Sequence, residues 1–81
     1  MHESLLHLFG RAIRSRREAT GMSQEELGAK TELSRNYIGM IERGETNVTL
    51  LVIQSLAAAL GTTMSALIQS LEHDFNSSTS R

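Results

Sequence analysis

The sequence contains no cysteine and no proline, and its formal net charge is only −1. Without cysteine the chain forms neither a disulfide framework nor a thiolate zinc site, which suits a reducing cytoplasm. No apolar run approaches the length of a membrane span, and the N-terminus lacks the apolar region of a signal peptide. The small net charge argues against a protein that coats nucleic acid by bulk charge alone. We therefore expect a globular cytoplasmic domain that neither spans a membrane nor depends on disulfides.

The length of 81 residues fits a single domain. A core of this size is marginal, so a partner subunit would add stability. We assign residues 1–75 to this domain and expect the polar residues 76–81 to form a disordered tail. Seven of the eight basic residues precede Gly44, and four of them lie between Arg11 and Arg17. One end of the fold is then expected to be locally basic, unless these residues form only a solvated face of one helix.

Apolar residues at three- and four-residue spacing predict an all-α chain of five helices. The first covers residues 4–20 and ends at Gly21. The second, over residues 24–31, opens with a capping box between Ser23 and Glu26. The third begins after the N-cap Ser34 and ends before Gly44. So few residues separate the second helix from the third that the two must pack directly as a helix-turn-helix.

The last two predicted helices carry more apolar surface than a chain of this size easily covers. Thr49 caps a helix over residues 50–60 that has almost no polar face, and Thr63 caps another over residues 64–75. Part of this apolar stripe must form the core of the chain itself. We interpret the surplus as the interface of a homodimer. The residues assigned to this interface are Leu60, Met64, Leu67, Ile68 and Leu71.

The third predicted helix has two different faces. Ile38 and Ile41 are three residues apart and are expected to face a core. Arg35, Asn36 and Met40 fall on the opposite side. A guanidinium suits the O6/N7 edge of guanine, and a carboxamide suits the N6/N7 edge of adenine. This face favours base reading in the major groove of double-stranded DNA, although an ordinary solvated surface helix would show the same pattern.

Several residues follow the order and spacing of a known family. They are Arg17, Gly21, Ser23-Gln24-Glu25-Glu26-Leu27, Ser34, Tyr37-Ile38, Ile41-Glu42 and Gly44. Through them the chain resembles the Cro/C1-type helix-turn-helix regulators of bacteria and phages, which implies a five-helix, lambda-repressor-like DNA-binding domain. The segments 34–38, 41–43 and 47–49 are most similar to the controller proteins of restriction–modification systems. That resemblance implies a transcriptional regulator that binds a pseudo-palindromic operator as a homodimer.

The resemblance also implies roles for individual residues. The base-reading positions of the family are matched by Arg35, Asn36 and Met40. Positions at the sugar-phosphate backbone are matched by Gln24, Ser34, Tyr37, Arg43, Asn47 and Thr49. Arg17 and Glu42 match a structural salt bridge between the first and third helices.

Two residues depart from the family pattern. Glu32 stands where the turn usually has Gly or Asn at positive φ, and Gly28 stands at a close helix contact that is usually Ala.

Other functions find less support in the sequence. It has no Gly-rich phosphate loop, no His-Glu-x-x-His motif and no carboxylate pair with an obvious pocket. His2, His7 and His73 are scattered along the chain. We therefore expect no enzyme, no metal site and no cofactor. An antitoxin-like or phage-type repressor that also binds a protein partner stays an alternative, although the polar tail is short for a partner-binding segment. A regulator that senses a small-molecule ligand is disfavoured, because no second domain is present.

Overall fold

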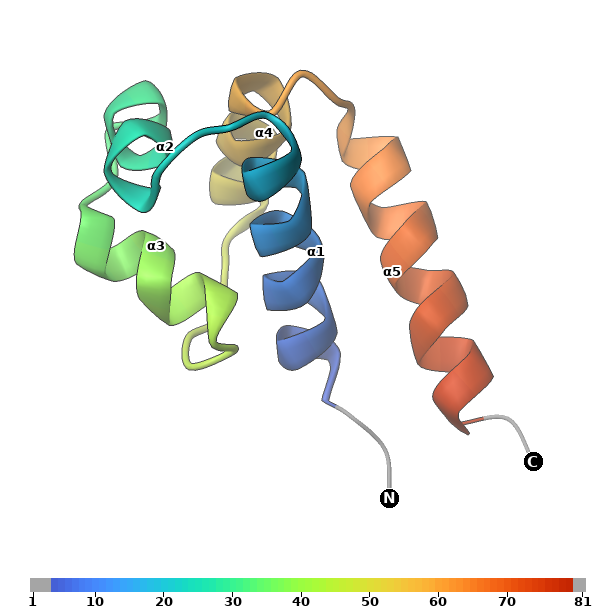
Figure 1. Ribbon diagram of the computed structural model, residues 1–81. Helices are drawn as coiled ribbons and strands as arrows, with labels where there is room; N and C mark the ends of the chain where they lie inside the picture. Colours follow the sequence, from blue (N-terminus) through green and yellow to red (C-terminus); the bar gives the residue numbers. More distant parts are fainter. Residues whose placement is uncertain (1–3, 80–81) are drawn as a thin grey trace.

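The computed structural model describes residues 4–79, which form five α-helices and no strand (Figure 1). The helices are α1 (Leu5–Ala19), α2 (Gln24–Thr31), α3 (Arg35–Glu42), α4 (Leu50–Ala59) and α5 (Met64–Thr79). This architecture confirms the predicted all-α fold with a helix-turn-helix in its middle. In Figure 1, α2 and α3 lie on one side of the molecule and α5 lies on the other, with α1 between them.

Local capping signals set where the helices begin. The Ser23 hydroxyl accepts a hydrogen bond from the Glu26 N–H at 3.0 Å, and the Glu26 carboxylate accepts one from the Ser23 N–H at 2.8 Å. Ser34 caps α3 and Thr49 caps α4 in the same way, each accepting a backbone N–H three residues later. Each cap satisfies a backbone donor that has no partner within the helix. The predicted starts of α2, α3 and α4 are therefore confirmed.

A single hydrophobic core joins all five helices. It is formed by Leu8, Phe9, Ile13, Leu27, Ile38, Ile41, Leu56, Ala57, Leu60, Leu67 and Leu71. Gly10 lets α1 pack directly on the end of α3, because a Cβ there would lie only 2.5 Å from the carbonyl oxygen of Glu42. Helix α3 is thus held by backbone contact at its C-terminal end and by Ile38 and Ile41 along its inner face.

The residues of the predicted dimer interface differ in how deeply they are buried within the single chain. The side chains of Leu60, Leu67 and Leu71 are buried within the single chain, with 7%, 1% and 7% of their surface exposed. The chain turns sharply between α4 and α5, so α4 packs on α2 and α5, and α5 packs on α1. Helical periodicity identifies a buried face, but it does not say whether the covering surface comes from the same chain. Of the predicted set, Ile68 stays 40% exposed and Met64 is partly buried.

The C-terminal helix is longer than the sequence predicts. Residues 76–79, expected to belong to a disordered tail, continue α5 as far as Thr79, and residues 80–81 lie outside the described part of the chain. No glycine or proline follows Phe75 to end the helix. Asn, Ser and Thr each make helix formation less favourable than Ala by only about 0.5–0.7 kcal/mol.

Within residues 4–79 no single helix is both long enough and apolar enough to span a bilayer. Helices α4 and α5 meet these two criteria only when taken together, and they are bent by 107° relative to each other.

The turn between α2 and α3 has the left-handed geometry that the family pattern implies. Glu32 adopts φ 60° and ψ 31° at the end of α2, although it is not glycine. The chain then passes close over the helix end, where the Leu33 N–H donates to the Gly28 carbonyl at 2.9 Å. A Cβ at Gly28 would lie 2.5 Å from the Leu33 carbonyl oxygen. Gly28 therefore gives the turn the space that it needs, while Glu32 carries its backbone strain.

We expect Glu32→Gly to raise the free energy of unfolding slightly or leave it unchanged. Left-handed backbone costs a residue with a Cβ about 1 kcal/mol, and glycine removes this strain while adding similar entropy to the unfolded chain. Chemical denaturation of the two proteins measures the difference. Lys30→Gly is the matched control, because Lys30 is exposed in the same helix at negative φ and should lose about 1 kcal/mol. Equal losses from both changes would refute the argument from strain.

Candidate nucleic-acid interface

The outer face of α3 presents planar polar groups that are free to bind something outside the chain. The side chains of Arg35 and Asn36 are exposed, and Met40 is half-buried beside them. Arg35 forms no side-chain hydrogen bond or ion pair with any residue among 4–79. The Asn36 amide nitrogen makes only a long contact of 3.9 Å with the Met40 sulfur. A guanidinium and a carboxamide therefore stand side by side on one exposed helical surface.

Two exposed hydroxyl groups cap helix N-termini, one at α3 and one at α4. The Ser34 hydroxyl accepts the Tyr37 N–H at 3.0 Å, and the Thr49 hydroxyl accepts the Val52 N–H at 3.1 Å. Each oxygen serves as an acceptor in its cap, so its own hydrogen remains free to donate to an anion. Hydroxyl donors at the positive end of a helix are well suited to phosphate oxygens.

The loop after α3 brings two more of the predicted residues together. The Tyr37 hydroxyl donates to the carbonyl oxygen of Asn47 at 3.5 Å, and the Thr46 hydroxyl donates to the same carbonyl at 3.2 Å. The Asn47 side chain itself is exposed. Tyr37 therefore links α3 to the loop that precedes α4.

Arg43, at the C-terminal end of α3, is held by a neighbour in the sequence. Its Nε donates to the Glu45 carboxylate at 3.0 Å, with both side chains about half exposed. This hydrogen bond raises the pKa of Arg43, and the charge of Glu45 adds to the effect. A Cβ at Gly39 would lie 3.0 Å from Arg43 Nη1 and 3.7 Å from Gln24 Nε2. The guanidinium thus lies back along α3, beside the amide of Gln24.

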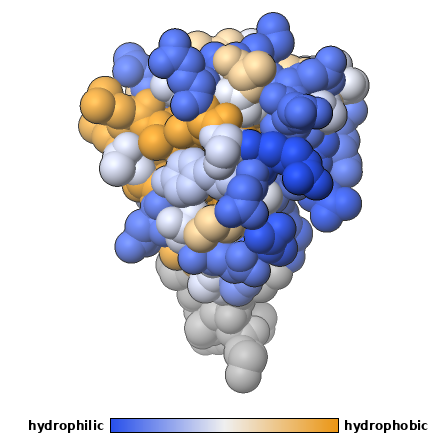
Figure 2. Space-filling model, turned by 90° about the vertical axis from the view of Figure 1, so that its left-hand side faces the viewer, coloured by the Kyte–Doolittle hydropathy of each residue, from blue (hydrophilic) through white to orange (hydrophobic). Residues whose placement is uncertain are grey.

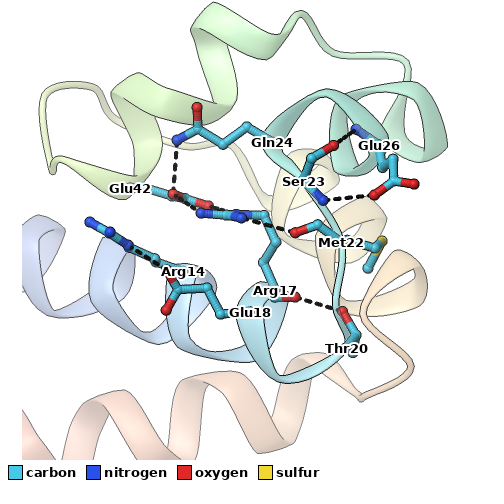
Figure 3. A network of polar contacts seen from close by, with 9 residues as sticks. All are labelled: Arg14, Arg17, Glu18, Thr20, Met22, Ser23, Gln24, Glu26 and Glu42. Carbon is cyan, nitrogen blue, oxygen red and sulfur yellow. Dashed lines mark hydrogen bonds and ion pairs between the residues drawn. The ribbon is translucent and has the colours of Figure 1, made fainter.

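Beneath this surface, a polar network joins the three helices around the turn (Figure 3). Arg17 of α1 donates from Nε and Nη2 to the two carboxylate oxygens of Glu42, at 2.6 and 3.0 Å. Its Nη1 donates to the Met22 carbonyl at 2.9 Å. The side chains of Arg17 and Glu42 are only 11% and 3% exposed. The hydrogen bond to Glu42 raises the pKa of Arg17 against the opposing effect of burial, so the guanidinium stays charged at any ordinary pH.

The same network reaches the interface through Gln24. Its amide nitrogen donates to Glu42 Oε1 at 3.0 Å (Figure 3). One of its two N–H groups is thereby occupied, and the other remains available for an outside acceptor. Glu42 thus holds Arg17 from α1 and Gln24 from α2 against the end of the recognition helix.

Sequence reasoning missed two of these contacts. The pairing of Arg43 with Glu45 has a visible signal, since the two opposite charges are two residues apart just after a predicted helix end. The bond between Gln24 and Glu42 has none, because 18 residues separate them and only the packing of α2 on α3 brings them together.

The surface on the helix-turn-helix side is mostly hydrophilic, with a hydrophobic area at one edge (Figure 2). Two leucines outside the predicted interface set are strongly exposed at the start of α4: Leu50 at 70% and Leu51 at 73%. Together with Gln54 and Met64 they line a shallow pocket of about 240 Å³. Residues 4–79 contain no cluster of three or more metal-ligating side chains.

Comparison with known proteins agrees with this geometry. The family described as Helix-turn-helix matches residues 13–67. Control protein C.MunI from Mycoplasma sp is 37% identical over 67 residues, which are 82% of this chain and 90% of that protein. The crystal structure of the restriction-modification controller protein C.AhdI from Aeromonas hydrophila has a TM-score of 0.75 at 44% identity, over 76% of this chain and 94% of that one.

A further solved structure contains nucleic acid. It is the restriction-modification controller protein C.Esp1396I, as a tetramer in complex with its natural 35 base-pair operator. It has a TM-score of 0.80 at 28% identity, over 91% of this chain and 97% of that chain. The chain therefore belongs to the Cro/C1-type helix-turn-helix family of DNA-binding transcriptional regulators, in which restriction–modification controller proteins are among its relatives.

Proposed function

We propose that this protein is a restriction–modification controller that binds a pseudo-palindromic operator as a homodimer and regulates transcription in the cytoplasm. The observation that carries the proposal is the outer face of α3, where Arg35 and Asn36 are exposed without strong partners among residues 4–79. The relation to C.MunI and C.AhdI supports the controller role. The operator complex of C.Esp1396I supports DNA as the partner. The role requires no catalytic residue, cofactor, metal or small-molecule ligand.

In this proposal the interface residues divide into two groups. Arg35, Asn36 and Met40 read base edges in the major groove, because they project from the exposed face of α3. The second group binds the sugar-phosphate backbone through amide, hydroxyl and guanidinium donors and sets the register of α3 in the groove. Its members are Gln24, Ser34, Tyr37, Arg43, Asn47 and Thr49.

We further propose that the two subunits meet through the exposed apolar side chains at the start of α4 and on α5. Leu50, Leu51, Met64 and Ile68 replace the buried leucines of the sequence-based assignment. Solvent-exposed leucines that line a common pocket cost solvation free energy in a monomer, and a second copy would cover them. A symmetric pair would place the two recognition helices about one DNA turn apart, ~34 Å.

The expected result is a dimer in sedimentation at tens of micromolar, and a monomer for Leu51→Lys. A buried, unpaired ammonium at the interface opposes association, because it loses hydration without gaining a partner. Ser15→Lys is the control, since it adds the same charge at an exposed position of α1. A wild-type protein that sediments as a clean monomer would refute the dimer, and a dimeric Leu51→Lys variant would refute this interface.

Selection of bound sites from random duplex DNA tests the function directly. We expect two inverted half-sites with centres about one helical turn apart, because a two-fold symmetric dimer presents two equivalent recognition helices. Enrichment of a single unrepeated site would contradict the homodimeric mode. No enrichment above the starting pool would contradict sequence-specific binding.

A further inference from the structure

We propose that Glu45 is an internal competitor for Arg43, which lowers the affinity of the protein for the DNA backbone. This inference rests on the proposed function, because it assumes that Arg43 binds a phosphate. The Glu45 carboxylate accepts the Arg43 Nε–H at 3.0 Å. A phosphate oxygen has the same charge sign and accepts the same donor. Glu45 therefore occupies the position that a phosphate would take at this edge of the guanidinium.

The arrangement makes release of Arg43 possible at small cost. The two side chains are 55% and 51% exposed, and ion pairs in such surroundings are weak. Arg43 Nη1 rests against Gly39, close to the Gln24 amide, so the guanidinium already lies beside another donor of the proposed backbone group. Binding then replaces the carboxylate by a phosphate and leaves Glu45 unpaired near the negative backbone. Both effects oppose binding whatever the base sequence.

Glu45→Gln is the informative change, because glutamine keeps the size and an acceptor oxygen but removes the charge. We expect its affinity to rise about two- to fivefold on both the selected and a scrambled duplex at low salt, which is the range of an exposed ion pair. The gain should shrink as salt increases, since screening weakens both the pair and the repulsion. Thermal denaturation should show at most a small loss of stability, because the pair is exposed.

The chain offers a matched control in the pair of Arg14 with Glu18 on α1. Its Nε–Oε2 distance is also 3.0 Å, and its side chains are 63% and 56% exposed. Glu18→Gln changes the net charge equally, so an equal gain would mean that only overall charge matters and would refute a specific role of Glu45. In an Arg43→Ala background the competition is absent, so Glu45→Gln should gain less than it does when Arg43 is present.

The remaining outcomes separate the two proposals. A wild-type protein that binds neither duplex would refute the proposed function. Wild-type binding together with an unchanged or weaker affinity of Glu45→Gln would refute only the competition by Glu45. A second measurement without DNA is the NMR signal of the Arg43 Nε–H group, which should shift when Glu45 becomes glutamine and stay unchanged in Glu18→Gln. No shift would show that the pair is absent in solution and would overturn the inference.

Discussion

Glu42→Ala is expected to lower the free energy of unfolding by about 3–5 kcal/mol, because it leaves the buried guanidinium of Arg17 without its carboxylate. Arg17 and Glu42 are joined by two hydrogen bonds in a site from which water is largely excluded. Gln24 would lose its acceptor as well. For a domain of this size the melting temperature should fall by more than about 10 °C, which calorimetry or circular dichroism measures.

Two comparisons make the Glu42 result interpretable. Glu25→Ala is the control for loss of a carboxylate, since Glu25 is exposed in the first turn of α2, and it should cost less than about 1 kcal/mol. The double change of Arg17 and Glu42 to methionine should cost less than Glu42→Ala alone, because it removes both buried charges together. Equal effects of Glu42→Ala and Glu25→Ala would show that Glu42 behaves as a surface residue in solution.

The second large effect is expected at Arg35. Replacing Arg35 by alanine should weaken binding to the selected site by about 1–3 kcal/mol and change binding to a scrambled duplex little. The physical reason is that a bidentate contact to a guanine edge forms only where the right base stands. Since Arg35 has no strong partner within residues 4–79, its removal should leave the fold intact. Binding isotherms on both duplexes across a salt series measure the difference.

Arg43→Ala is the contrasting variant for this experiment. It removes a charge from the proposed backbone group, so binding to both duplexes should weaken and the dependence on salt should become flatter. The two arginine variants should therefore differ in kind. If Arg35→Ala loses equal affinity on both duplexes, Arg35 is one more phosphate contact and another residue reads the base.

Local signals in the sequence predicted the fold well, because each of them acts over three or four residues. The capping box at Ser23 and Glu26 and the caps at Ser34 and Thr49 depend on nothing distant. The burial of Leu67 and Leu71 within the single chain could not be predicted in this way, since the bend between α4 and α5 decides what covers them.

Long-range polar contacts were predictable only through resemblance. The pairing of Arg17 with Glu42 spans 25 residues, and no spacing rule in the sequence specifies it. The bond from Gln24 to Glu42 and the position of the Arg43 guanidinium against Gly39 depend on the packing of α2 on α3. The exposure of the proposed base-reading face follows more directly, because Ile38 and Ile41 fix the inner face of α3 and leave its other face outside.

The two faces of α3 have a consequence for how such regulators diverge. Ile38, Ile41 and Glu42 keep the helix in the domain, whereas Arg35 and Asn36 contribute neither core packing nor strong internal bonds. Substitutions at the outer positions therefore carry little penalty in folding and can accumulate freely. In the proposed function, two descendants of one ancestor can therefore acquire different target sequences while sharing the same scaffold. Two copies with different outer residues can then work in one cell without occupying each other's sites.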